Sequence, residues 1–140
     1  MNPYTIFADI IAGRAPSSQV YADDDCVAFM DIRPMTPGHV LVVPRVAARS
    51  LAELDPVVGG KLFQVGQRVA AALRVSEVAC DGVNFFLADG VTAGQEVFHV
   101  HLHVIPRTPG DGFGLRGRPT SPARADLDYL AGSIRGALDR

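Results

Sequence analysis

The chain has 140 residues, 48% of them hydrophobic, so it is long enough to bury a core as one globular domain. A formal net charge of −2 gives no electrostatic basis for binding nucleic acid or a membrane surface, and neither is expected as a partner. Two isolated cysteines, Cys26 and Cys80, are too few for a disulfide framework, which favours a reducing, cytoplasmic location.

Short elements are expected in the first third of the chain. Apolar residues at helical spacing predict a short helix over residues 5–12, closed by Gly13. Residues 18–22 and 26–31 flank an acidic turn and are typical of the two strands of a hairpin. A third strand is predicted over residues 39–44, after a break rich in proline and glycine.

A long helix follows. Asp55 is its expected N-cap and Pro56 its first residue. Over residues 56–73 the apolar side chains recur at the spacing of one helix face: Leu62, Val65, Val69 and Leu73.

The rest of the chain contains two more predicted strands, over residues 82–87 and 98–107, joined by a loop of small residues over 88–95. Residues 107–120 are rich in Gly, Arg and Pro and are expected to be mobile. A C-terminal helix is predicted over about 122–138, with an apolar stripe of Leu127, Leu130, Ile134 and Leu138.

These elements predict an α+β fold, with a five-stranded antiparallel sheet and the helices on one face. No linker or repeat divides the chain, so we expect a single domain over residues 1–140, with its core over about 4–115.

Three of the four histidines alternate with apolar residues in the last predicted strand. Side chains two residues apart share one face of a strand, which places His99, His101 and His103 in a row with a spacing of roughly 6–7 Å. The opposite face would then enter the core through Val100, Leu102 and Val104. Imidazole is a nucleophile, a base and a metal ligand near neutral pH, so the row indicates a functional site.

Two other interpretations of this row remain open. It could be a polar strand face in contact with solvent, although threonine or charged residues would serve that purpose equally well. It could also bind a metal, because His-x-His on a strand is a common ligand pattern. Glu96 has the wrong strand parity to join such a set, whereas His39 could be a fourth ligand.

Two segments resemble the histidine triad (HIT) family. Residues Gly94 to Arg107 resemble its signature, His-φ-His-φ-His-φ-φ with φ apolar, and Asp31 to Arg45 resembles a second motif, Asp-Ile-x-Pro-x-x-Pro-x-His-x-Leu-Val-x-Pro-Lys. The resemblance extends from residue 4 to about 115. It implies a nucleotide hydrolase or nucleotidyl transferase that acts at the α-phosphorus of a nucleoside phosphate. It also implies a homodimer in which two five-stranded sheets join into one.

The resemblance gives each histidine an expected role. His101 matches the nucleophile, which would form a covalent nucleotidyl-histidine and release a nucleoside monophosphate after attack by water. His99 would brace the same strand region, and His103 would contact phosphate oxygens and the leaving atom. His39 would orient the cluster by hydrogen bonding. This scheme requires no metal and no other cofactor.

The resemblance also implies where the nucleotide binds. Asp31 matches the carboxylate that accepts from the ribose hydroxyls. The residues from Gly94 to Val97, which include Gln95 and Glu96, would offer backbone N–H groups to the phosphates. The apolar pocket for the base would be formed by Ile6, Phe7, Ile10, Phe29 and Ile32.

This chain departs from the family pattern at several positions. Thr5, Ala8 and Ala47 stand where many bacterial members have the ligands of a structural zinc, so zinc is not expected. Ala88 replaces an amide residue that contacts substrate, and strand parity alone does not show whether the nearby Asn84 substitutes for it.

The substrate type therefore stays open. Glu96 replaces a Ser or Thr that hydrogen-bonds the leaving group in phosphoramidate-hydrolysing members, whereas the ending Ile105-Pro106-Arg107 resembles dinucleoside-polyphosphate hydrolases. We first expect a hydrolase of one of these two types. The alternative is a nucleotide-binding or sensing protein with little turnover, in which ligand binds but no nucleotide becomes attached to His101.

Overall fold

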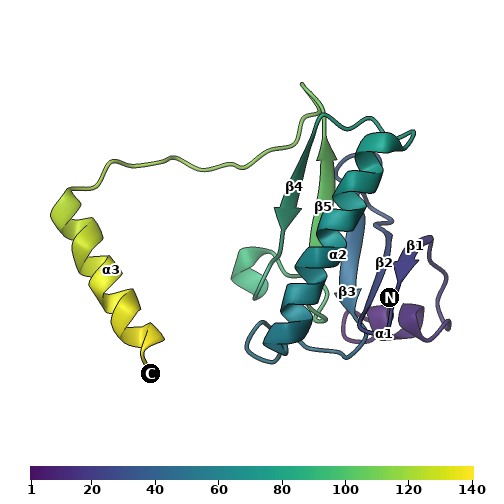
Figure 1. Cartoon of the computed structure of the whole chain (residues 1–140), viewed down its shortest axis with the longest axis horizontal. Helices are drawn as coiled ribbons and strands as arrows, with labels where there is room; N and C mark the ends of the chain where they lie inside the picture. Colours follow the sequence, from purple (N-terminus) through teal and green to yellow (C-terminus); the bar gives the residue numbers. More distant parts are fainter.

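The computed structural model describes residues 1–140. Its centre is a five-stranded antiparallel sheet in the order β1-β2-β3-β5-β4 (Figure 1). The strands are Gln19–Ala22 (β1), Cys26–Met30 (β2), Val40–Pro44 (β3), Gly82–Phe86 (β4) and Leu102–Arg107 (β5). Antiparallel pairing needs only short connections, which fits the hairpin pattern of the sequence and confirms the predicted α+β fold.

Four helical segments accompany the sheet: Ile6–Ile11 (α1), Pro56–Val75 (α2), the 3₁₀ turn Val91–Ala93 (η1) and Arg124–Leu138 (α3). The long helix α2 covers one face of the sheet, while α1 packs against the other (Figure 1). The expectation that all helices share one face is therefore wrong for α1. None of the helices is both long and apolar enough to cross a bilayer.

The predicted helix face of α2 forms the main core. Leu62, Val65, Val69 and Leu73 are all buried, and they pack in one core with Leu102 and Val104 of β5 and with Val100, which precedes that strand. Asp55 caps the helix as expected, since its Oδ1 accepts a hydrogen bond of 2.8 Å from the N–H of Val57. Periodicity and capping chemistry thus placed this helix correctly from the sequence.

A second, smaller core lies on the opposite face of the sheet. It consists of Phe7 from α1 and alternate residues of β2 and β3, namely Val27, Phe29, Leu41 and Val43. Because strand side chains alternate between faces, the intervening residues of β2 and β3 belong to the α2 core. The histidines share the α1 face, where the Phe7 ring lies 5.0 Å from that of His101.

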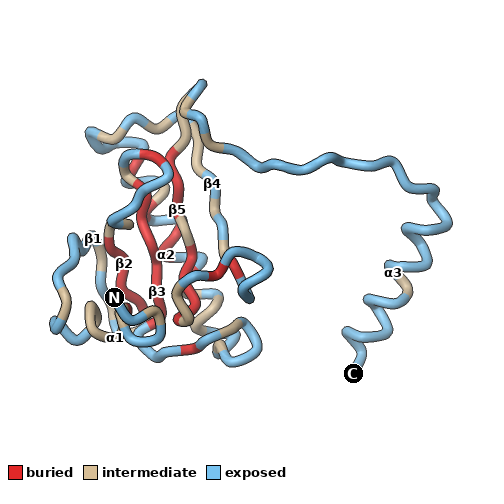
Figure 2. Tube along the Cα trace, turned by 180° about the vertical axis from the view of Figure 1, so that it is seen from behind, coloured by how far each residue is buried: buried red, intermediate tan, exposed pale blue.

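The C-terminal segment departs from the rest of the molecule (Figure 2). Arg107 forms an ion pair with Asp111 at 2.7 Å, and the chain then runs as an exposed arm to α3. This helix begins at Arg124, slightly later than the predicted start near residue 122. No residue of α3 is buried, so the stripe predicted from periodicity packs on no part of this chain: Leu127, Leu130, Ile134 and Leu138.

Candidate functional site

The histidine-rich run is only partly a strand. β5 begins at Leu102, so His99 and His101 lie just before the ladder that was predicted to start at residue 98. The N–H of Phe98 bonds to Pro3 O at 2.9 Å and that of Val100 to Ala48 O at 2.7 Å, so loop residues replace a neighbouring strand here. Val100 is fully buried all the same, and the expected alternation is preserved.

The hydrogen bonding of His101 leaves one ring nitrogen available for chemistry. Its Nδ1 lies 2.8 Å from the carbonyl oxygen of His99. A carbonyl accepts but cannot donate, so we assign the proton of the neutral ring to Nδ1. The lone pair is then on Nε2. Burial lowers the pKa of His101 below its usual value, which keeps the ring neutral and the lone pair free at neutral pH.

His39 and His103 form a pair whose hydrogen-bond direction is set by the backbone. The N–H of Met35 donates to His39 Nδ1 at 3.1 Å, so the ring proton of neutral His39 is on Nε2. This Nε2 lies 2.8 Å from His103 Nδ1, which therefore accepts. His103 must then carry its own proton on Nε2. A lone pair on His101 and a proton donor on His103 thus belong to neighbouring rings, whose centroids are 4.8 Å apart.

The environment keeps His103 uncharged. Burial, with further contributions from His101 and His39, lowers the pKa of His103 to about 3. Burial also lowers the pKa of His39, and the carboxylate of Asp31, 3.6 Å from Nε2, only partly opposes this effect. Close imidazoles resist simultaneous protonation, so the cluster is neutral as a unit at physiological pH.

His99 ties the run to the end of β3. Its Nε2 lies 2.7 Å from the carbonyl oxygen of Pro44, which requires the ring proton on that nitrogen. Burial lowers the pKa of His99 as well. The ring is thereby fixed against the sheet, while its main-chain carbonyl orients His101.

Metal binding fits these residues poorly. Asp31, His39 and His103 have potential ligand atoms within 4.8 Å of one another. A cation bound at His39 Nε2 would displace the proton there, and the only other ring nitrogen already accepts from Met35. The structural zinc site expected from the family resemblance fits no better, because Thr5, Ala8 and Ala47 offer no thiolate or imidazole.

A buried amide organises the loop expected to face the phosphates. Gln95 accepts from the N–H of Gly90 at 2.8 Å and donates to the carbonyls of Arg49 and Val97. Of the four N–H groups expected to bind phosphate, those of Gly94 and Gln95 already bond within the loop. Those of Glu96 and Val97 have no acceptor within the chain. Gly94 adopts φ +96°, a left-handed conformation that favours glycine.

The structure brings most of the expected base-pocket residues together. Ile6, Phe7, Ile10 and Phe29 all belong to the small core on the α1 face, which also includes Val97. Ile32 does not belong to it, because its side chain is 84% exposed.

Asp31 lies beside the histidines. One oxygen accepts from the N–H of Arg33 at 2.8 Å, and the other lies 3.6 Å from His39 Nε2. Its carboxylate is partly exposed at the position expected for ribose.

Asn84 does not take over the function of the amide missing at position 88. Its Oδ1 accepts from the Arg107 guanidinium at 2.7 Å, in the middle of β4 and four residues before position 88. The residue paired with His103 is instead Phe86, whose ring lies 5.6 Å from the imidazole. Ala88 itself is buried.

Sequence reasoning missed several partners of the histidines. The N–H of Met35 and the carbonyl of Pro44 set ring protonation, but backbone groups have no signature in the sequence. Arg33 was missed as well. Its guanidinium lies 3.3 Å from the carboxylate of Glu96, 63 residues further along the chain. Only its place two residues after Asp31 could have suggested it.

Comparisons with known proteins agree with this geometry. The model of the HIT domain matches residues 12–110, and the chain belongs to the HIT family. A Bacillus subtilis relative, Protein hit, is 42% identical over 136 residues, 95% of this chain and 93% of its own. The adenylylsulfatase HINT3 of Arabidopsis thaliana is 33% identical over 106 residues, 76% of this chain and 53% of its own.

Solved structures share the fold over nearly the whole chain. A HIT family protein from Bacillus anthracis superposes with a TM-score of 0.87 at 36% identity, covering 94% of this chain and 95% of its own. A zinc-bound histidine triad protein from Mycobacterium smegmatis gives 0.76 at 38% identity, with coverage of 96% and 94%. A histidine triad nucleotide-binding protein from Candida albicans gives 0.86 at 26% identity, with 96% of each chain covered. The chain therefore shares the fold of HIT family structures, one of which is named a nucleotide-binding protein.

Proposed function

We propose that this protein is a hydrolase or nucleotidyl transferase that attacks the α-phosphorus of a nucleoside phosphate through His101 and releases a nucleoside monophosphate. The hydrogen bond from His101 Nδ1 to His99 O carries the proposal, because it leaves the lone pair of Nε2 available on a neutral, buried ring. Asp31 would hold the ribose, and the α1 core around Phe7 would contact the base.

In the first step, His101 Nε2 forms a bond to the α-phosphorus while the bond from phosphorus to the leaving atom breaks. The electron pair of that bond goes to the leaving atom, which accepts a hydrogen bond from His103 Nε2–H and takes its proton from solvent. The free N–H groups of Glu96 and Val97 would stabilise the charge that develops on the phosphate oxygens.

In the second step, water attacks the same phosphorus and releases a proton to solvent. The bond from phosphorus to His101 breaks, and its electron pair returns to Nε2. The site thereby regains its starting protonation and releases a nucleoside monophosphate. No step requires a metal or other cofactor.

The family supports a substrate with a good leaving group on the α-phosphorus. The Arabidopsis relative is an adenylylsulfatase, so a sulfated nucleoside monophosphate belongs among the candidates beside dinucleoside polyphosphates and nucleoside phosphoramidates. All of them present the same phosphorus to His101.

Intact-mass spectrometry of reactions quenched with denaturant at alkaline pH, where the P–N bond of a nucleotidyl-histidine survives, tests the proposal directly. Wild type and His101→Asn would be incubated with this panel, and the products separated by chromatography. We expect a nucleotidyl adduct or nucleoside monophosphate from wild type, and turnover reduced by several orders of magnitude in the variant with nucleotide binding retained. Full activity of His101→Asn would refute the nucleophile assignment.

Ala88 favours one alternative. The buried methyl group supplies no amide to the substrate, and Asn84 is engaged by Arg107. The protein could therefore bind nucleotides with little turnover. Binding by calorimetry without adduct or product would establish that function, and Ala88→Asn would then be the first variant to test for restored turnover.

We also propose a homodimer. β4 is an edge strand, paired only with β5, and Phe86 on it is 41% exposed. On the neighbouring α2, Phe63 is 53% exposed and packs edge-on against Phe85. Exposed aromatic side chains beside an unpaired strand edge suit the joining of two sheets. Light scattering coupled to size-exclusion chromatography measures the mass in solution, and a monomer would contradict this proposal.

A further inference from the structure

We infer that Glu96, opposed by Arg33, selects the leaving group by charge and favours a cationic amine over an anionic polyphosphate. This inference rests on the proposed function and names the substrate class for the same site. It concerns the ion pair that joins the segment after β2 to the phosphate-facing loop, in which Arg33 Nη2 lies 3.3 Å from Glu96 Oε2.

The position of this pair is fixed by its neighbours. Arg33 follows Asp31 by two residues and donates its N–H to that carboxylate at 2.8 Å. Glu96 lies between Gln95, which is buried and holds the loop, and Val97, which packs against the α1 core. The pair therefore lies on the rim of the site, between the expected ribose and phosphate positions.

Both side chains are 77% exposed, so neither is committed to the other. An exposed ion pair contributes little free energy, which leaves each charge available to a ligand. Separating Arg33 from Glu96 therefore requires little free energy. The charge of the incoming leaving group then decides which of the two side chains it contacts.

The sum of charges on the rim is negative. Asp31 and Glu96 carry two negative charges, Arg33 carries one positive charge, and the four histidines are neutral. The α-phosphate of a substrate adds another negative charge. A polyphosphate leaving group would bring several more, whereas an ammonium group would be attracted by the exposed carboxylate of Glu96.

The other arginines in this half of the molecule are occupied elsewhere. Arg107 is held by Asp111 and Asn84 at the far end of β5. Arg45 donates to the carbonyl of Asp23 at 2.6 Å, and the guanidinium of Arg49 lies 5.6 Å from the ring centroid of Tyr4. Arg33 is the cation that forms an ion pair with the phosphate-facing loop, and the exposed carboxylate of Glu96 partly neutralises it.

A matched pair of substrates isolates this effect. Adenosine phosphoramidates with an aminopropyl or a butyl group on the nitrogen have the same length and differ by one ammonium charge. The measured quantity is the ratio of kcat/KM for the aminopropyl compound to that for the butyl compound. The different basicity of the two leaving amines affects every variant equally, so only changes in the ratio between variants are interpreted.

Variants at the two positions should move this ratio in opposite directions. Glu96→Gln removes the carboxylate and should lower the ratio by about two- to fivefold, while Arg33→Gln frees the carboxylate and should raise it by a similar factor. Sodium chloride at about 1 M should lower the ratio of wild type towards that of Glu96→Gln, because salt screens exposed charges.

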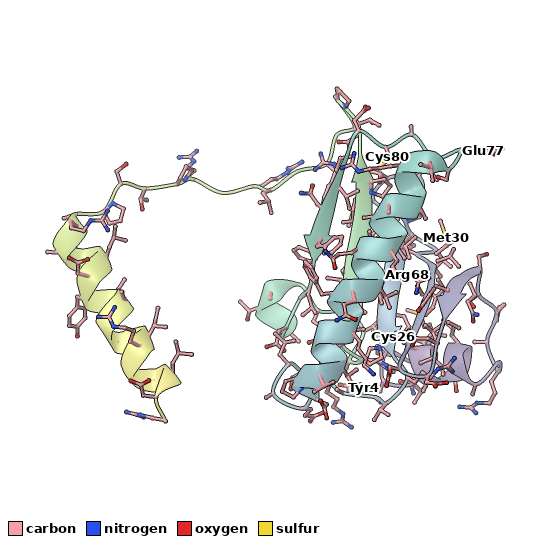
Figure 3. All side chains as sticks on the ribbon, in the orientation of Figure 1. Tyr4, Cys26, Met30, Arg68, Glu77 and Cys80 are labelled. Carbon is pink, nitrogen blue, oxygen red and sulfur yellow. The ribbon has the colours of Figure 1, made fainter.

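Glu77→Gln is the matched control. Glu77 is an exposed carboxylate just beyond the C-terminal end of α2, away from the η1 end of the sheet (Figure 3). Its variant should leave the ratio unchanged. Turnover with a ratio that is unaffected by Glu96→Gln and Arg33→Gln would overturn the inference alone. No adduct and no product with any substrate would instead refute the proposed function.

Discussion

Replacing His103 with glutamine should reduce the acid sensitivity of the folded protein. In the fold the pKa of His103 lies near 3, mainly because of burial, whereas an unfolded histidine titrates near 6.5. As pH falls below that unfolded value, the unfolded chain takes up a proton that the folded ring refuses. Stability supplied by the neutral ring is thus complete above about pH 6.5 and declines until the folded ring titrates near pH 3.

The magnitude follows from this difference in proton uptake. Each histidine that stays neutral in the fold lowers the free energy of unfolding by up to about 1.4 kcal/mol per pH unit in this window. Between about pH 6.5 and pH 4.5 the contribution of His103 alone amounts to about 2 kcal/mol. Against a typical stability of about 5–15 kcal/mol, this loss is large enough to measure.

The assay is urea denaturation of wild type and His103→Gln at both pH values. Glutamine is chosen because its amide oxygen can still accept from His39 Nε2, so the direction of that hydrogen bond is preserved. The pH-dependent loss of stability should be about 2 kcal/mol smaller in the variant. Carboxylates contribute equally to both proteins and cancel in the comparison.

The same loss of stability in both proteins would refute this reasoning. It would mean that the His103 ring accepts a proton in the fold as readily as in the unfolded chain. Imidazole chemical shifts in NMR provide an independent measurement, and the signal of His103 should stay constant over the same pH window.

Two further substitutions test the packing that supports the site. Phe7→Ala should lower the free energy of unfolding, measured by urea denaturation, by about 3 kcal/mol. It should also raise the pKa of His101 towards its usual value in NMR titration, because the ring centroids of Phe7 and His101 are only 5.0 Å apart. An unshifted pKa would show that other groups exclude water from His101. Gly66→Ala should destabilise the protein by about 1–3 kcal/mol, since the new Cβ would lie 3.0 Å from Leu102 Cδ2 and 3.1 Å from the Phe85 ring. Unchanged stability in urea denaturation would show that α2 moves away from the sheet with little loss of free energy.

The sequence predicted the fold wherever periodicity and burial agree. The apolar face of α2 and its Asp55 cap were placed correctly because helix spacing and capping are local properties. The strand run at residues 98–107 was predicted too long, because its apolar alternation persists where Ala48 and Pro3 replace a partner strand. Alternation reports which face is buried, and it does not report which backbone groups pair.

The same limit explains why the sequence predicted helix α3 correctly but did not predict what its apolar stripe packs against. Its stripe of apolar residues predicts a helix that buries one face, and a helix does form, yet no residue of it is buried within this chain. Periodicity specifies the face and leaves the partner open, because the covering surface belongs to residues far away in sequence or to another molecule. The turn after β5 also contributes, since Arg107 and Asp111 fix the path along which the arm leaves the sheet.

The histidine motif predicted which side chains meet, but the protonation of the site is determined by main-chain groups. One N–H from Met35 orients His39 and, through it, His103, while the carbonyls of His99 and Pro44 orient the two remaining rings. Buried imidazoles without these partners would exchange tautomers, and a lone pair and a proton would not stay on adjacent nitrogens. Burial keeps the rings uncharged, and backbone groups fix the nitrogen that carries each proton. The two effects therefore act together. Side-chain substitutions around the cluster should shift its pKa values more readily than they reverse its hydrogen bonds.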